Sequence, residues 1–259
     1  MSAPVVIITG ASRGIGASAA RLAAHLGACV TLAGRSEAAL RDEAGKIQAA
    51  GGQALVVTAD VSQEADCQAV AQQTLARFGR IDALVNNAGD IEPIRPAAEA
   101  DPEAWKQNWS VNVLGTVMML KHALPALRQS AGRVIIISSG ASENPIPGWG
   151  PYCAAKAALN HLTRVLALEE PGITILALRP GIVDTDMQSV IRSKGPGRMG
   201  QRSYEWLAGL HEQGLLLPPD APGKAIAVLA WAAPHEWSGQ SLQWDDPRVR
   251  DLALTVWKE

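Results

Sequence analysis

The chain has 259 residues, a formal net charge of −2 at pH 7 and 47% hydrophobic residues. This composition is typical of a compact protein with a sizeable core, and it excludes a strongly basic nucleic-acid-binding surface and a long membrane-spanning segment. The three cysteines are widely spaced without a Cys-x-x-Cys motif and the first strand begins at Val5, so we expect reduced thiols, no metal site and a cytoplasmic protein without a signal peptide.

The first predicted unit is a strand, a glycine-rich turn and a helix. Residues 5–9 are apolar and rich in β-branched side chains, and a helical pattern then runs to about residue 26. The turn has the spacing Gly-x-x-x-Gly-x-Gly, not the commoner Gly-x-Gly-x-x-Gly. Such a turn lets a phosphate approach the free N–H groups of the helix N-terminus; an ordinary tight turn is the alternative. The candidate cofactor-binding residues here are Gly10, Ser12, Arg13, Gly14, Ile15 and Gly16.

The second strand, residues 29–33, indicates which dinucleotide would bind. An acidic residue at the end of this strand would bind the free ribose 2′-hydroxyl of NAD(H). This sequence has no acidic residue there and offers Arg35 instead, with Arg13 in the glycine-rich turn. Because two guanidinium groups suit a 2′-phosphate, we predict NADP(H). The alternative is that both arginines simply face solvent.

The third and fourth strands, residues 54–58 and 81–85, also run into polar residues. Asp60 could contact an adenine amino group, or it could cap the helix that begins near Gln63. Amide side chains and glycine after the fourth strand suit hydrogen bonding around a cofactor. The candidate cofactor-binding residues of these two strand ends are Asp60, Val61, Asn87, Ala88 and Gly89.

A long helical pattern over residues 105–127 carries Asn112 among apolar neighbours. A buried amide needs a hydrogen-bond partner, so Asn112 either holds a water near Lys156 or satisfies a neighbouring carbonyl. The fifth strand, residues 134–137, follows this helix and leads to Ser139.

Tyr152 and Lys156 begin the next helical pattern, which runs to residue 170. A spacing of four residues places both side chains on one face of a helix. A phenol has a pKa of about 10, and a fixed cation nearby favours the phenolate and lowers that pKa. The hydroxyl of Ser139 could hold a substrate oxygen beside the phenol. The alternative is an ordinary surface pair.

The sixth strand covers residues 173–178. Alternation of strands and helices predicts a single-domain α/β fold over residues 1–259, a Rossmann-type doubly wound parallel sheet of about seven strands flanked by helices. Ligands of such sheets bind at the carboxyl ends of the strands, where the candidate polar residues fall. Those that follow the sixth strand are Pro180, Gly181, Val183 and Thr185.

The pattern loosens over residues 187–217, where several glycines surround a short helix. A long glycine-hinged insertion after the sixth strand predicts a mobile lid over a substrate; disorder without consequence is the alternative. A last long helix, 222–233, and a strand, 241–244, complete the pattern. The candidates for an apolar substrate pocket, each of which could equally be a packing residue, are Trp149, Met187 and Trp206.

These motifs occur together in one family. The sequence resembles the short-chain dehydrogenase/reductase family over nearly its whole length, and Ser139 matches the family's serine because it lies thirteen residues before Tyr152. The active-site half is also similar to the sepiapterin-reductase and benzil-reductase branch. The family motifs are Thr9-Gly-Ala-Ser-Arg-Gly-Ile-Gly16, Asp60, Asn86-Asn-Ala-Gly89, Asn112, Ser139, Tyr152-x-x-x-Lys156 and Pro180-Gly181.

The resemblance implies a role for each of the central residues. Tyr152 would transfer a proton, and Lys156 would bind the nicotinamide ribose and lower the pKa of the tyrosine. Ser139 would orient the substrate carbonyl, and Asn112 would anchor a water of the proton relay. Thr185 matches a position that contacts the nicotinamide carboxamide.

The activity that the resemblance implies is an NADPH-dependent carbonyl reductase acting reversibly on a ketone or an α-diketone, benzil-like or another bulky or aromatic carbonyl. It also implies a homodimer or homotetramer formed through the helices that carry Asn112 and Tyr152. The partners would be small molecules, with no nucleic acid and no membrane. Two alternatives stay open, namely a non-catalytic NADP(H)-sensing protein and a dehydratase or epimerase on the same fold.

Overall fold

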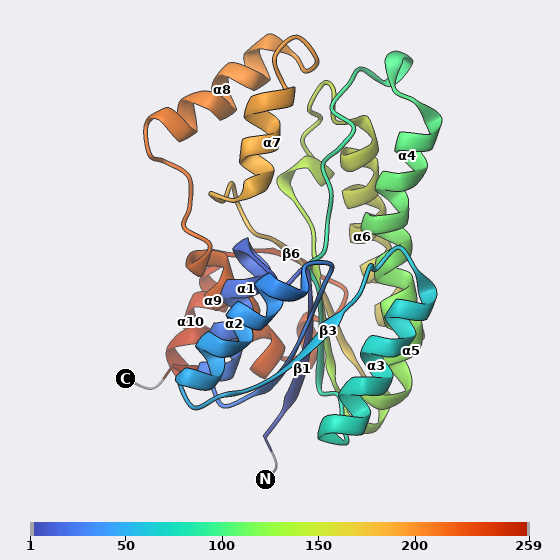
Figure 1. Cartoon of the computed structure of the whole chain (residues 1–259), viewed down its shortest axis with the longest axis vertical. Coiled ribbons are helices and arrows are strands. Elements are labelled where there is room, and N and C mark those ends of the chain that lie inside the picture. Colours follow the sequence, from blue (N-terminus) through green and yellow to red (C-terminus); the bar gives the residue numbers. More distant parts are fainter. Residues whose placement is uncertain (1–2, 258–259) are drawn as a thin grey trace.

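The fold is built on one parallel sheet of seven strands, in the order β3-β2-β1-β4-β5-β6-β7. The computed structural model describes residues 3–257 (Figure 1). The predicted Rossmann-type, doubly wound α/β architecture is therefore confirmed. The strands are β1 (Val5–Thr9), β2 (Cys29–Gly34), β3 (Gln53–Thr58), β4 (Ala83–Asn86), β5 (Arg133–Ile137), β6 (Thr174–Arg179) and β7 (Ser241–Gln243).

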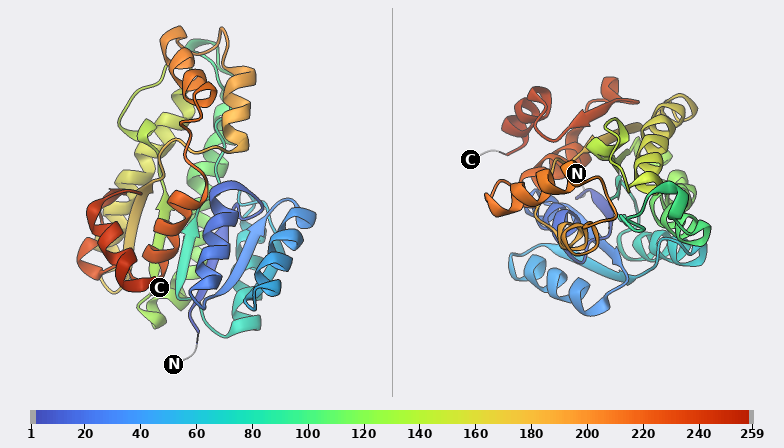
Figure 2. Two further views of the ribbon diagram at one scale, coloured as in Figure 1. Left: turned by 90° about the vertical axis from the view of Figure 1, so that its left-hand side faces the viewer. Right: turned by 90° about the horizontal axis from the view of Figure 1, so that it is seen from above.

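Two groups of helices cover the two faces of the sheet (Figures 1 and 2). One face is covered by α1 (Gly14–His25), α2 (Glu37–Ala49), α9 (Asp220–Ala232) and α10 (Pro247–Val256). The other is covered by α3 (Glu64–Phe78), α5 (Gly115–Ser130) and α6 (Gly150–Glu169). None of the described helices is long and apolar enough to cross a lipid bilayer.

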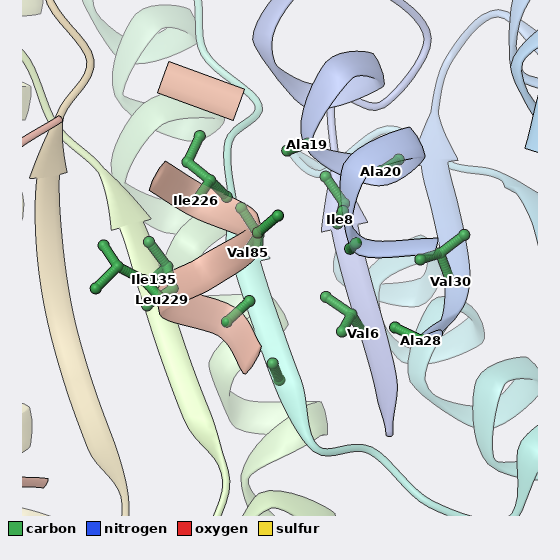
Figure 3. Close-up of a cluster of buried hydrophobic side chains, with 14 of the residues drawn as sticks. Val6, Ile8, Ala19, Ala20, Ala28, Val30, Val85, Ile135, Ile226 and Leu229 are labelled. Atoms are coloured by element: carbon green, nitrogen blue, oxygen red, sulfur yellow. The ribbon is translucent and has the colours of Figure 1, made fainter. Parts of the chain in front are cut away.

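Alternate residues of β1 show why this strand sits at the centre. Val6 and Ile8 point to the face covered by α1 and α9 and belong to the same hydrophobic cluster as Ile226 and Leu229 (Figure 3). Ile7, between them, points to the opposite face and joins the other hydrophobic cluster. A strand buried on both faces needs such a continuous run of apolar β-branched residues, so the hydrophobic effect fixes β1 between both layers and places the turn that follows it.

The predicted helix over residues 105–127 is interrupted. The structure has α4 (Pro102–Trp109), a π-helical turn (Ser110–Leu114) and then α5, which continues to Ser130. Single π-helical turns of this kind are often found at functional sites. Here the turn centres on Asn112, whose side chain bonds to backbone groups of a neighbouring loop. Helical periodicity could not reveal the turn because the apolar spacing continues through it.

The segment from 187 to 217 is more ordered than its loosened pattern predicts. It contains most of α7 (Asp186–Lys194) and all of α8 (Gln201–Glu212), which stand above the carboxyl edge of the sheet (Figures 1 and 2). Its base is closed by a short parallel bridge between Val183 and Leu217. The sequence pattern also gave no indication of α10.

Candidate active site

The glycine-rich turn between β1 and α1 forms the floor of the site. Gly10 and Gly14 have φ values of +64° and +55°, which side-chain-bearing residues rarely adopt. A Cβ on Gly16 would lie 2.5 Å from Asn87 Nδ2, too close for any side chain. Arg13, at the N-cap of α1, makes no capping bond with its side chain. The first N–H groups of α1 therefore face a cradle that fits a dinucleotide phosphate.

Asn87 holds this turn in place. Its Nδ2 donates to Thr9 O at 2.9 Å and to Gly10 O at 3.2 Å. The Thr9 hydroxyl accepts from the backbone N–H groups of Asn87 and Ala88, each at 3.0 Å. The Asn87 side chain thus braces the end of β1, and Ala88 and Gly89 continue along the rim. Thr9 is part of the family motif, but its hydroxyl was assigned no role from the sequence, although a hydroxyl that closes a buried apolar strand was a usable signal.

Asp60 makes a local turn after β3. Its Oδ1 accepts from Ser62 N at 2.9 Å and from Ser62 Oγ at 2.8 Å, while its own N–H donates to Asp66. The N-cap of α3 is Gln63, which lacks a side-chain capping bond. Of the two alternatives for Asp60, helix capping is therefore wrong, because its carboxylate bonds to a residue before the helix. Val61 is buried and packs against Gly115.

The two arginines expected to bind a 2′-phosphate differ in their surroundings. Arg13 Nη1 lies 2.8 Å from Asp186 Oδ2, and both side chains are largely exposed. Arg35 is exposed after β2, and the described part of the chain gives it no ion-pair partner. The Arg13–Asp186 pair, which sequence reasoning missed, links the glycine-rich turn to the start of α7.

Tyr152 lies buried at the start of α6, with 6% of its surface exposed. The Ser139 side chain lies beside its phenol, and its ring meets Trp149 edge-on, with 5.9 Å between ring centroids. Burial raises the pKa of Tyr152 to about 12, and the neighbouring Ser139 side chain opposes that rise. The phenol is therefore neutral at physiological pH, the form that can donate a proton.

Lys156 is one helical turn further along α6 and is also buried. Its Nζ donates to Ile137 O at 2.8 Å and lies 5.5 Å from the centroid of the Tyr152 ring. Burial lowers the pKa of Lys156 to about 8. The expectation that Lys156 brings the pKa of Tyr152 below its ordinary value is wrong for the protein alone, because burial of the phenol raises that pKa and only the Ser139 side chain opposes the rise.

Asn112, on the π-helical turn, lies near Gly89 and Lys156. Its Nδ2 donates to Asp90 O at 2.8 Å and to Asn108 O at 3.0 Å, and its Oδ1 accepts from Asp90 N at 3.2 Å. A Cβ on Gly89 would lie 3.0 Å from Asn112 Oδ1 and 3.6 Å from Lys156 Nζ. Asn112 thus satisfies neighbouring carbonyls, as one of the two expected alternatives had it. The absent side chain at Gly89 leaves Asn112 and Lys156 facing one small space.

The segment after β6 closes the opposite side of the glycine-rich turn. Gly181 has a φ of +81°, and a Cβ there would lie 2.6 Å from the side chain of Leu217. Thr185 approaches Gly14, where a Cβ would lie 3.1 Å from its methyl group. Of the expected cofactor residues after β6, Thr185 is thus adjacent to the first turn.

An apolar cluster surrounds Tyr152 under α7 and α8. Trp149 is buried in it, and Met187 packs against it, whereas Trp206 is 53% exposed and lies outside it. A cavity of about 530 Å³ opens next to this cluster, and its lining includes Pro96, Pro147 and Met199 but not Trp149. Sequence reasoning missed several members of the cluster because they come from segments without a regular apolar period. These are Ile91, Ile94, Ala141, Ile191, Met199 and Leu207.

The described residues hold no cluster of three or more side chains that could bind a metal ion. All three cysteines are free thiols, and none lies in a disulfide. The polar groups that converge at this edge of the sheet are a phenol, two amides, a hydroxyl and an ammonium. They can transfer a proton and bind an oxygen, and the adjacent glycine cradle can hold a dinucleotide.

Comparison with known proteins gives the same picture. The profile described as short chain dehydrogenase matches residues 4–195. An uncharacterised oxidoreductase of Saccharomyces cerevisiae is 36% identical over 96% of this chain and 98% of its own. A crystal structure of that yeast short-chain dehydrogenase/reductase matches with a TM-score of 0.92, covering 96% of this chain and 99% of its own.

Two other relatives carry names that describe their chemistry. A benzil reductase of Saccharomyces cerevisiae that forms (S)-benzoin is 32% identical over 95% of this chain and 97% of its own. An alcohol dehydrogenase of Thermococcus sibiricus, solved with 5-hydroxy-NADP, is 29% identical with a TM-score of 0.78, covering 93% of this chain and 95% of its own. The profile match and these full-length relatives establish that the chain is an oxidoreductase of the short-chain dehydrogenase/reductase family.

Proposed function

We propose that this protein is an NADPH-dependent carbonyl reductase that reduces a ketone or an α-diketone and can run in reverse as an alcohol dehydrogenase. The observation that carries the proposal is the buried Tyr152, with the Ser139 side chain and the Lys156 ammonium beside its phenol ring. This group stands at the carboxyl edge of the sheet, next to a glycine cradle that fits a dinucleotide.

The chemistry of reduction follows from the protonation states. When bound, the reduced nicotinamide supplies a hydride to the carbonyl carbon. Tyr152, neutral because burial raises its pKa to about 12, donates the proton that the developing alkoxide requires. The Ser139 hydroxyl donates a hydrogen bond to the same oxygen and stabilises its charge. Lys156 places a cation next to the phenol and stabilises the phenolate that the proton transfer leaves behind.

The cofactor part of the proposal rests on charge. Arg35 is exposed at the end of β2, where an acidic residue would favour NAD(H), and Arg13 lies nearby in the glycine-rich turn. A 2′-phosphate would bind Arg35, and it would compete with Asp186 for Arg13. The Thermococcus relative, which was solved with an NADP derivative, supports this preference. Asn112 would anchor a water between Lys156 and the solvent.

The substrate would be bulky and largely apolar. Trp149 meets the Tyr152 ring edge-on, and Met187 packs against the apolar cluster that contains both. The benzil reductase relative supports an aromatic diketone as one member of the substrate class. Residues 187–217 would act as the lid, because their two helices leave the sheet and return at a narrow base.

We also propose a homo-oligomer in the cytoplasm. Apolar side chains that no described residue covers lie at the end of the π-helical turn, on α5 and on α6, the helices named by the family resemblance. Exposed fractions of 51% for Leu114, 41% for Val117 and 85% for Leu168 support burial of this surface against a second copy.

The direct test is NADPH oxidation against a panel of carbonyls that includes benzil-like diketones, with chiral analysis of the products. The proposal predicts turnover that consumes NADPH and a strong preference over NADH. Saturable NADPH binding without turnover on a broad panel would instead identify a cofactor-sensing protein. Conversion of a substrate without net NADPH consumption would identify a dehydratase or epimerase.

A further inference from the structure

Helix α6 meets the segment that carries Ser139 at three successive turns. Tyr152 lies beside the Ser139 side chain, and Lys156 Nζ donates to Ile137 O. One turn further on, Asn160 Nδ2 donates to Ser142 Oγ at 2.8 Å. The first two contacts belong to the reacting groups. The third involves a buried amide that the proposed chemistry does not use.

The contact of Asn160 continues to Ser139 itself. The Ser142 hydroxyl donates to Ser139 O at 2.6 Å, and the Ser142 backbone N–H donates to the same oxygen at 3.1 Å. The amide nitrogen of Asn160 is a donor only, so Ser142 must accept from it and keep its own proton for Ser139. The direction of the chain Asn160 to Ser142 to Ser139 is therefore fixed by chemistry.

The Ser139 side chain is held from a second direction. Its Oγ accepts from Ala141 N at 3.1 Å, where it caps the short helical turn Gly140–Ser142. This bond occupies an acceptor position on Oγ and turns the hydroxyl proton away from the backbone, towards the oxygen it must bind. The orientation of that proton depends on the turn, and Ser142, which Asn160 holds, is the last residue of the turn.

We propose that Asn160 is a positioning residue for the carbonyl-binding serine, acting through Ser142, and that it sets the orientation of the Ser139 hydroxyl in the transition state. This inference rests on the proposed reductase function. Asn160 touches no reacting atom. Its role is to fix the position of the turn after Ser139 relative to the helix that carries Tyr152. Small displacements of a catalytic group have large effects on rate.

The decisive variant is Asn160→Asp. A carboxylate has nearly the same shape but accepts only, so it would take the Ser142 proton that otherwise goes to Ser139 O. We expect kcat to fall about tenfold, with KM for the carbonyl and the dissociation constant for NADPH changed less than about twofold. Ser142→Ala removes the same link and should give the same loss, with no further loss in the double variant.

Asn144 offers a matched control. Its Nδ2 donates to Gly140 O at 3.0 Å, so it bonds to the same short turn from the exposed side, without a bond to Ser139. Asn144→Asp should leave kcat within about twofold of the parent, because the Ser139 carbonyl keeps both of its donors.

A cycle with Ser139→Ala separates positioning from general stabilisation. If Asn160 acts through Ser139, Asn160→Asp should have little further effect on kcat once the hydroxyl is gone. An unchanged tenfold loss in the Ser139→Ala background would overturn the inference, as would full kcat in Asn160→Asp. The function itself fails separately, if Ser139→Ala and Tyr152→Phe both turn over at the parental rate.

Discussion

The strand-end site and the α7–α8 segment are built in different ways. Around Tyr152 the polar groups are buried and bonded to the backbone, as Lys156 is to Ile137 O and Asn87 is to Thr9 O. Along α7 and α8 the polar contacts lie at the surface, as in the pair Lys194–Glu92. The strand-end site is therefore held by bonds to the sheet backbone, whereas the α7–α8 segment contacts it mainly through apolar side chains.

The largest expected effect is on the free energy of unfolding, and it is measured by replacing one tryptophan in each region. Trp149→Ala removes a buried indole from the cluster around Tyr152 and should lower the free energy of unfolding by about 3–5 kcal/mol. Trp206→Ala removes a side chain that is 53% exposed on α8 and should cost less than about 1 kcal/mol. Urea denaturation of both variants measures the difference, and equal losses would show that the two regions are packed alike.

The next effect concerns the strand-end site alone. Ser139→Ala removes a hydrogen bond to the developing alkoxide, so kcat should fall about 100-fold with little change in NADPH affinity. Steady-state kinetics with a carbonyl substrate, together with fluorescence titration of NADPH, separates the two quantities. A loss confined to NADPH affinity would place the serine in the cofactor site instead.

Cofactor choice gives a smaller effect. Arg35→Ser should weaken NADPH binding about tenfold and leave NADH binding nearly unchanged, because only NADPH carries a 2′-phosphate. Arg202→Ser removes the same charge from α8, away from the expected cofactor-binding residues, and serves as the matched control. Equal weakening of both cofactors by Arg35→Ser would contradict the assignment.

The smallest effect is a pH dependence of stability. Burial lowers the pKa of Lys156 to about 8, so between pH 8 and 9 the unfolded chain binds more protons at this residue than the folded protein does. Its contribution to the free energy of unfolding should therefore rise by about 1 kcal/mol over that interval. Thiols also titrate there, so the measurement is the difference between the parent and Lys156→Met. If the variant kept the parental pH dependence, burial of Lys156 would not be its cause.

The sequence predicted the strand-end site well because its signals are local. A buried β-branched strand followed by glycine or a small polar residue identifies a strand end, and parallel strands bring such ends together. Gly10, Ser139 and Thr185 come from β1, β5 and β6, and the sheet order explains why they share one edge.

The remaining features depend on tertiary contacts. The π-helical turn at Asn112 arises from bonds to the Asp90 backbone, which no periodic pattern contains. Met199 lies between α7 and α8, in a stretch of sequence with several glycines. It is buried in the cluster around Tyr152 because the tertiary fold brings that stretch there. The pKa of Tyr152 was predicted with the wrong sign, because spacing reveals the neighbouring cation but not the degree of burial.

The central claim is that the Tyr152 phenol delivers the proton, and Tyr152→Phe tests it most directly. The variant keeps the buried ring and should bind NADPH with parental affinity. Its kcat for carbonyl reduction should nevertheless fall about 1000-fold, since a general acid of this kind contributes roughly 100- to 10,000-fold. Reduction at the parental rate by a folded, NADPH-bound Tyr152→Phe variant would contradict the account.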